Sequence, residues 1–169
     1  MYTLSETSLK MLKGVHPNLV NFMTELIKIS PWNFKITAGV RTAEEQNRLY
    51  QKGRTAPGTK VTNVDGYKLK SNHQVKFNGL GYATDIGVLV KEKVKVSVME
   101  NGKKIEKVIE KDVYKGTWKD FHYYQDIYNA AKNAGLLEKY GIEWGGNCWR
   151  TFKDAPHWQI KGADRVPYK

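Results

Sequence analysis

Two segments of this chain, residues 71–86 and 144–159, constrain its fold most, because the side chains able to bind a metal ion are divided between them. The first, SNHQVKFNGLGYATDI, contains His73 and Asp85, and the second, WGGNCWRTFKDAPHWQ, contains His157. Two imidazoles and one carboxylate are a minimal ligand set for a catalytic zinc ion and leave a coordination position for water. We therefore expect a fold that brings the two segments together around one ion.

The local sequence before His157 predicts a turn followed by a strand. Pro156 lacks an amide hydrogen and disfavours a helical conformation of Ala155. Asp154 and His157 are therefore expected at a turn that enters a strand over residues 157–160. Asp154 can then reach an activated water and accept its proton. Each residue alone also has an ordinary interpretation, because a single His is more often a surface or core residue and Asp often closes a turn.

Four motifs occur in a fixed order along the chain. They are AGVRTAEEQN at 38–47, continuing to Leu49–Tyr50 and Gly53–Thr55; Ser71 and His73 as S-x-H; Gly81, Ala83 and Asp85 as G-x-A-x-D; and Trp144–Gly146 leading to D-x-P-H at 154–157. This pattern resembles the zinc peptidases of the D-alanyl-D-alanine carboxypeptidase and L-alanyl-D-glutamate endopeptidase family, and more narrowly its phage endolysins. The resemblance extends from about Leu9 to Gln159.

The resemblance implies a site with one zinc ion, and it implies roles for individual residues. His73, Asp85 and His157 would be the zinc ligands, and Asp154 would be the general base and then the proton donor to the leaving amine. Arg41, at the end of an expected strand, would be a catalytic residue that binds the substrate or stabilises the transition state. The alternative is that Arg41 pairs with a structural acid.

Ser71 and the spacing of the first two ligands need separate comment. Ser71 would either bind the substrate or hydrogen-bond to the backbone near His73. The short form of the family places the first His seven residues before the Asp, whereas His73 and Asp85 are twelve apart. We expect the extra residues, within 74–80, to form a loop that leaves the ligands in place. The alternative downstream ligand is His122, which lies in an expected helix without a matching motif.

The fold class expected is α+β, with a small antiparallel sheet that carries the zinc ligands and is packed by helices. The resemblance implies the zinc fold shared by D-Ala-D-Ala peptidases and Hedgehog proteins. At 169 residues, the chain is expected to form a single catalytic domain over 1–169 without a separate cell-wall-binding domain. The single cysteine, Cys148, excludes an internal disulfide and a Cys-rich zinc site, and we interpret it as a packed thiol.

Periodicity and turn residues predict the individual elements. Helices are expected at 8–12, from Pro17 to before Pro31, at 43–51 and at 118–135. Strands are expected at 34–39 and 86–90, and a β-hairpin at 93–114 with its turn at Asn101-Gly102. Residues 53–72 are expected to form a mobile loop or a small hairpin. The hairpin is either a decoration that contacts substrate or cell wall or an extension of the sheet.

The charge and the N-terminal sequence suggest where such a protein acts. The net charge of +11 favours anionic partners such as a cell-wall or membrane surface. The lysines are scattered rather than clustered, so a nucleic-acid partner is not expected, and a solubilising basic surface is the simpler alternative. Neither a signal peptide nor a membrane-spanning segment is recognisable. We expect synthesis in the host cytoplasm and, as the resemblance implies, holin-dependent release to the periplasm.

The function expected is that of a zinc metallopeptidase cutting peptidoglycan stem peptides, an L-alanyl-D-glutamate endopeptidase used as an endolysin in host lysis. Within the enzyme class, the alternative is a D-Ala-D-Ala carboxypeptidase. From other classes, the alternatives are a non-catalytic zinc-stabilised cell-wall-binding module and a nucleic-acid-binding protein or nuclease. The spare carboxylate of Asp154 argues against the binding module, because a structural zinc site does not need a base. We expect a monomer.

Overall fold

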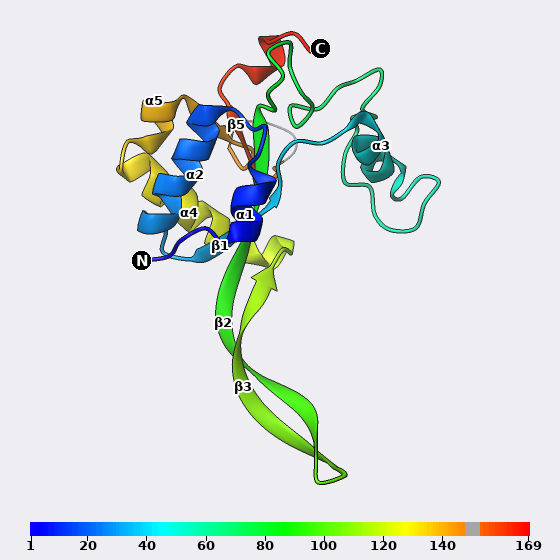
Figure 1. Ribbon diagram of the computed structural model, residues 1–169, viewed down its shortest axis with the longest axis vertical. Coiled ribbons are helices and arrows are strands. Elements are labelled where there is room, and N and C mark those ends of the chain that lie inside the picture. Colours follow the sequence, from blue (N-terminus) through cyan, green and yellow to red (C-terminus); the bar gives the residue numbers. More distant parts are fainter. Residues whose placement is uncertain (148–152) are drawn as a thin grey trace.

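The computed structural model describes residues 1–147 and 153–169 (Figure 1). Its helices are α1 (Glu6–Met11), α2 (Pro17–Ile29), α3 (Ala43–Gln51), α4 (Phe121–Asn133) and α5 (Leu136–Tyr140), with short 3-10 turns at Trp118–Asp120 and Ala163–Arg165. Its strands are β1 (Asn33–Ala38), β2 (Ala83–Glu100), β3 (Lys103–Lys115), β4 (Ile142–Trp144) and β5 (His157–Ile160).

The described strands form one antiparallel sheet, with β2 at its centre. The first part of β2 pairs with β1 on one side and with β5 on the other, and β4 follows β5. Further along, β2 pairs with β3 from Val88 to Glu100. In this register Asp85 on β2 lies directly opposite His157 on β5. Because directly opposite residues point to the same face, the pairing itself places these two side chains together.

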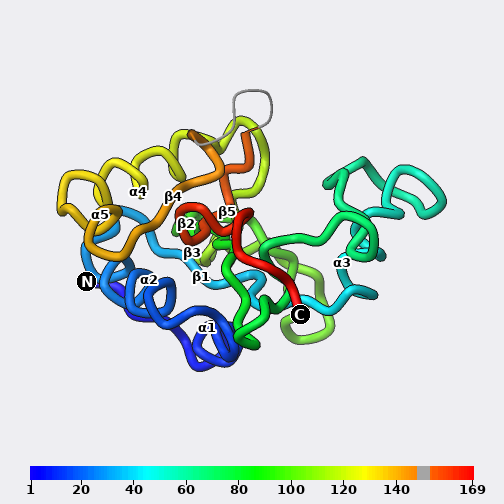
Figure 2. The backbone as a smooth tube through the Cα atoms, turned by 90° about the horizontal axis from the view of Figure 1, so that it is seen from above, coloured from blue at the N-terminus to red at the C-terminus, as the bar shows by residue number. Residues whose placement is uncertain are grey.

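One face of the sheet is covered by helices α2, α4 and α5 (Figures 1 and 2). Trp158 points toward these helices, and its ring lies 5.4 Å from that of Phe22 on α2 and 5.9 Å from that of Trp144 on β4. Side chains alternate along a strand, so the neighbours of Trp158 point to the opposite face. The largest fully buried side chains of this core are Trp144, Trp158, Tyr124, Phe22, Leu19, Met23, Leu26, Ile27, Ile86 and Ile127.

Local sequence explains where two of these helices begin. At α2 the ring of His16 accepts a hydrogen bond from the amide of Asn18, and Pro17 takes the first helical position. At α3 the hydroxyl of Thr42 accepts from the amide of Glu45, whose carboxylate accepts from the amide of Thr42. This reciprocal cap fixes the start of α3 immediately after Arg41.

The opposite side of the sheet carries α3 and the irregular segment 52–70, clearly separated from α2, α4 and α5 in Figure 2. The side chain of Gln46 on α3 donates to the carbonyl of Val64, and that of Asn47 donates to the carbonyl of Asp65. These bonds attach the segment to α3. The helical layer and this second layer therefore lie on different sides of the strands that carry Asp85 and His157.

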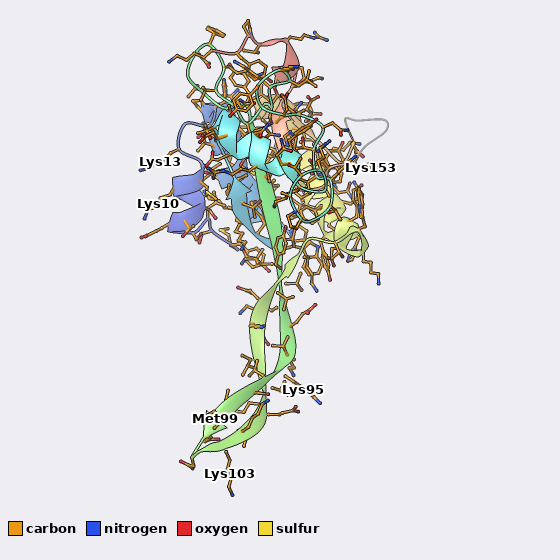
Figure 3. The ribbon with its side chains drawn as sticks, turned by 90° about the vertical axis from the view of Figure 1, so that its right-hand side faces the viewer. Lys10, Lys13, Lys95, Met99, Lys103 and Lys153 are labelled. Carbon is orange, nitrogen blue, oxygen red and sulfur yellow. The ribbon has the colours of Figure 1, made fainter. Side chains whose placement is uncertain are left out.

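The second half of β2 and most of β3 form a two-stranded arm that extends away from the body (Figure 1). The turn at its end is made by Asn101 and Gly102, both with positive φ, as a type I′ hairpin requires. Lys95, Met99 and Lys103 lie near this end, far from the helices (Figure 3). One face of the arm is lined by half-buried Val94, Val96, Val98 and Ile105.

The expected fold class is confirmed, and several boundaries differ from expectation. Strand 86–90 and the first hairpin strand are one continuous β2, because the pairing of β2 passes from β1 to β3 without a break. The helix expected at 118–135 begins as a 3-10 turn and becomes α-helical at Phe121, and α5 was not expected. Segment 53–72 does not form a hairpin. The interpretation of Cys148 lies outside the described residues. No described helix is long and apolar enough to span a membrane.

Candidate active site

Three side chains converge on the face of the sheet opposite the helices: His73 from the loop before β2, Asp85 from β2, and His157 from β5. Asp85 Oδ1 lies 3.1 Å from His73 Nε2 and 3.2 Å from His157 Nδ1, and the two ring nitrogens are 3.3 Å apart. The three residues form a group that could hold a metal ion. The structure thus brings together the ligands expected from sequence.

Hydrogen bonds on the far side of each ring decide which nitrogen faces this group. His73 Nδ1 lies 2.7 Å from the carbonyl oxygen of Gly39, and His157 Nε2 lies 2.9 Å from Oε1 of Gln159. Both partners are acceptors, so these nitrogens carry the hydrogen in a neutral ring. The lone pairs of His73 Nε2 and His157 Nδ1 therefore point at each other and at the Asp85 carboxylate.

This arrangement fits zinc. Bonds of about 2.0–2.1 Å at tetrahedral angles place neighbouring ligand atoms roughly 3.3 Å apart. The triangle of 3.1, 3.2 and 3.3 Å matches that separation. Two lone pairs and a carboxylate oxygen so close together repel one another unless a cation or a proton lies between them. Both imidazoles are also held by second hydrogen bonds, as is usual for metal-binding His.

The ionisation of these groups suits cation binding. Burial lowers the pKa of His73, which keeps that ring neutral. Burial opposes the ionised form of Asp85, but nearby His73, His157 and Arg41 hold its pKa well below the usual value. Burial also opposes the charged form of His157, and the carboxylates of Asp85 and Asp154 outweigh it and raise its pKa. Metal binding requires the neutral form of both imidazoles, so a cation competes with protons for His157.

Arg41 pairs with a residue of the site itself. Its guanidinium forms an ion pair with Asp85 Oδ2 and donates to Gln46 Oε1 at 3.3 Å, and its amide donates to the carbonyl of His73 at 3.0 Å. Arg41 therefore does pair with an acid, as the alternative interpretation of this residue expected. That acid, however, is a candidate metal ligand and not a purely structural residue. By holding Oδ2, Arg41 leaves Oδ1 directed at the two histidines.

Asp154 lies half-buried in the same groove as the three candidate ligands. The turn expected from Pro156 positions it: the Asp154 amide donates to the carbonyl of Gly145, and the His157 amide donates to the carbonyl of Asp154. The indole of Trp144 anchors this turn by donating to the carbonyl of Ala155 at 2.7 Å. Burial and the charge of Asp85 raise the pKa of Asp154 to about 6.

Ser71, the extension and His122 occupy distinct positions. The hydroxyl of Ser71 accepts from the amide of His73 at 3.3 Å, one of the two contacts expected for it. The extra residues close a tight loop in which the amide of Lys76 donates to the carbonyl of Leu80 at 2.9 Å, so His73 keeps its place beside Asp85. His122 is exposed on α4 and is not part of the metal-binding group.

A groove of about 1190 Å³ opens over the site, between the sheet and segment 52–70. Three lysines, Lys52, Lys60 and Lys70, line it together with Arg41. The groove thus has basic side chains besides the acidic Asp85, Asp154 and Asp164. The basic groups can pair with carboxylates of a substrate.

Sequence reasoning missed the side chains that orient the ligands. Gln159 binds His157, Gln46 binds Arg41, and Asn72 binds Gln159 at 3.0 Å. Gln159 could have been inferred, because it lies two residues after His157 in an expected strand and so shares its face. Asn72 could not, because its partner is distant in sequence.

Two imidazoles and a carboxylate at zinc-ligand spacing, with a further carboxylate in the groove, define the class of site found in mononuclear metal hydrolases. The family model of phage L-alanyl-D-glutamate peptidases matches residues 1–116. The chain therefore belongs to the phage L-alanyl-D-glutamate peptidase family, as the sequence motifs predicted.

Two characterised proteins are similar to this chain. Peptidoglycan L-alanyl-D-glutamate endopeptidase CwlK of Bacillus subtilis (strain 168) is 30% identical over 125 residues, which are 74% of this chain and 59% of that protein. The chain thus spans less than two thirds of this relative. The crystal structure of Serratia marcescens L-Ala D-Glu endopeptidase ChiX matches with a TM-score of 0.60 at 25% identity and covers 97% of this chain and 93% of that chain.

Proposed function

We propose that this protein is a zinc peptidase that hydrolyses the bond between L-alanine and D-glutamate in peptidoglycan stem peptides. The observation that carries the proposal is the triangle of His73 Nε2, Asp85 Oδ1 and His157 Nδ1, with distances of 3.1, 3.2 and 3.3 Å between the three atoms. Family membership and the two relatives named as L-Ala-D-Glu endopeptidases support the choice of bond.

The residues around the triangle have distinct roles in this proposal. Zinc in such a site supplies Lewis acidity, which activates water and polarises a carbonyl. The carboxylate of Asp154 takes the proton of the attacking water and returns it to the nitrogen of the leaving amine. Arg41 keeps Asp85 oriented and offers its remaining N–H groups to the substrate carbonyl. Ser71 supports the backbone at His73 and borders the groove, where it can bind the peptide.

The groove suggests how the substrate is oriented. Glutamate has two carboxyl groups and uses only one of them in the peptide chain, so the other can remain as a carboxylate near the scissile bond. Lys52, Lys60 and Lys70 line the groove and can pair with this carboxylate and others further along the stem. The net charge of +11 also favours attraction to the anionic cell wall.

A test is to incubate the protein and zinc with defined stem peptides and to identify the products by mass spectrometry. Release of a fragment that begins with D-glutamate supports the endopeptidase. Loss of only the terminal D-alanine indicates the carboxypeptidase alternative. If the protein binds zinc and peptide but leaves both bonds intact, it is the non-catalytic binding module instead.

The biological setting belongs to the same proposal. As a member of a phage peptidase family, the protein would act on the host cell wall at lysis. We propose that it is made in the host cytoplasm and reaches the wall through a holin. Expression with and without a co-expressed holin tests this: culture lysis that requires both proteins supports the pathway, and lysis by this protein alone contradicts it.

A further inference from the structure

A buried chain of polar side chains lies behind His157, on the side away from Asp85, and the proposed mechanism does not use it. Its central members are Gln159, Asn72 and Lys76, which are 1%, 8% and 0% exposed. Burying an amide or an ammonium group is costly unless each polar atom finds a partner. The contacts of these three residues therefore show which groups this set of buried polar side chains holds in place.

The orientation of Gln159 is fixed by partners that can act in only one way. Its Nε2 donates to Oε1 of Glu143 at 2.6 Å, and a carboxylate can only accept. Its Oε1 must then face the other side, where it accepts from Asn72 Nδ2 at 3.0 Å and lies 2.9 Å from His157 Nε2. The hydrogen of a neutral His157 ring is thereby directed to Nε2, and the lone pair to Nδ1.

The orientation of the Asn72 side chain, immediately before His73, is likewise fixed by partners that can only accept or only donate. Its Nδ2 also donates to Oδ1 of Asp164 at 2.7 Å, which can only accept. Its Oδ1 accepts from Lys76 Nζ at 2.8 Å, which can only donate, and from the hydroxyl of Tyr168 at 3.1 Å. Lys76 Nζ lies 3.3 Å from the centre of the Tyr168 ring. The amide of Asn72 thus has one permitted orientation, with its donor side toward Gln159.

The C-terminal segment completes this arrangement from outside. The backbone at Tyr168 forms a bridge with Lys76, and the amide of Phe77 donates to the carbonyl of Pro167 at 2.9 Å. Asp164 and Tyr168 both reach Asn72 from this segment. The last residues of the chain therefore hold the loop of His73 against strand β5, which carries His157.

We infer that Gln159 is a positioning residue that selects the metal-binding tautomer of His157, and that Asn72, held by Asp164, Lys76 and Tyr168, keeps Gln159 in that orientation. The inference rests on the proposed metal site but not on which bond is cut. A purely structural role for Gln159 predicts lower stability when it is replaced. A positioning role predicts, in addition, a changed tautomer and weaker metal binding.

The test is Gln159→Met, which keeps the approximate size of the side chain and removes the acceptor. Zinc affinity is measured by competition with a chelator, and we expect a 10- to 100-fold loss, the usual cost of removing such a partner. Nitrogen-15 NMR of the histidine rings in metal-free protein at alkaline pH reports the tautomer. In the natural sequence, the hydrogen of His157 is expected on Nε2, and in the variant on a mixture of both nitrogens.

Two further variants separate positioning from stability. Tyr124→Phe removes another hydrogen bond of a buried side chain, from the Tyr124 hydroxyl to the carbonyl of Lys115 at 2.6 Å, on the helical side of the sheet. It should lower the melting temperature without changing zinc affinity or the tautomer. In the double variant Glu143→Gln and Gln159→Glu, the amide at position 143 donates to the carboxylate at position 159, which still accepts from His157. The zinc affinity of this double variant should be within a few-fold of that of the unaltered protein.

The inference is overturned if Gln159→Met keeps both zinc affinity and the tautomer, or if Tyr124→Phe weakens zinc binding equally. If Gln159→Met does not fold, the tautomer measured in the unaltered protein still tests the inference, because a His157 hydrogen on Nδ1 contradicts it. Failure of the unaltered protein to bind zinc would contradict the proposed function, whereas the tautomer measurement in metal-free protein would still test the role of Gln159.

Discussion

At the residue scale, the site separates the groups that can bind a metal ion from the group that can move a proton. Asp85 shares its carboxylate between Arg41 and the two histidines and is held ionised. Asp154 lies in the same groove with a pKa raised to about 6 by burial and by the charge of Asp85. Two carboxylates in one pocket thus have environments that favour different roles.

Asp154→Ala tests the proton-transfer role. We expect peptide cleavage to fall by about 100-fold or more, the usual range for a general base, while zinc affinity stays within a few-fold. Cleavage is followed by mass spectrometry and zinc binding by chelator competition. Asp112→Ala, on the exposed arm, is the matched control and should cleave normally. Unchanged cleavage by Asp154→Ala would exclude it as the base.

Arg41→Lys tests whether the forked geometry of the guanidinium matters. Lys cannot contact Asp85 and Gln46 together while also offering donors to a substrate, so we expect kcat/KM to fall roughly tenfold or more. Arg48→Lys makes the same replacement on the exposed face of α3, away from the site, and should leave kcat/KM unchanged. Equal kinetics for both variants would show that charge alone is sufficient at position 41.

At the element scale, β2 serves two purposes along its length. Its first residues hold Asp85 between β1 and β5, and the remainder forms the arm with β3. Of the arm, only Tyr114, near its base, lines the groove. The distal arm is therefore not required for the geometry of the site, and a two-stranded ribbon contributes little to the stability of the body.

Shortening the arm tests this separation. Val94 and Ile109 face each other across β2 and β3 as the same type of pair as Glu100 and Lys103, which flank the natural turn, so residues 95–108 can be replaced by Asn-Gly. We expect cleavage of soluble stem peptides and the melting temperature to remain close to those of the full chain. Cleavage of intact cell walls is measured in parallel. A loss confined to walls would assign the arm to wall contact, and a loss on soluble peptides would contradict its independence from the site.

At the scale of the whole molecule, the candidate ligands join parts of the chain that are distant in sequence. His73 lies on a loop held by the C-terminal segment, while Asp85 and His157 lie on neighbouring strands. An ion bound only by the folded state stabilises it by mass action, by about 2.7 kcal/mol when free ion is a hundred times its dissociation constant.

Metal removal should therefore lower the melting temperature, and added zinc should restore it. His73→Ala should abolish this zinc-dependent rise, because it removes a ligand. His122→Ala, at an exposed histidine on α4, should retain the rise in full. Scanning calorimetry with and without chelator provides the measurement. If His73→Ala still responds to zinc as the unaltered protein does, the ion binds elsewhere.

Features that depend on neighbouring residues could be predicted from the sequence. Thr42 and Glu45 predicted the start of α3, and Asn101-Gly102 predicted the turn of the arm. Pro156 predicted the turn that enters β5. These features were predictable because capping, turn geometry and the missing amide hydrogen of proline act within a few residues.

Which distant groups meet could not be predicted in this way, because it depends on how the whole chain packs. The register that sets Asp85 opposite His157, the continuity of β2 into the arm, and the contact of Asn72 with Gln159 all join residues that local patterns leave independent. The family motifs predicted the three candidate ligands, but not the partners that turn their lone pairs inward. Those partners are selected by packing and by the need to satisfy every buried donor and acceptor, which only the complete fold imposes.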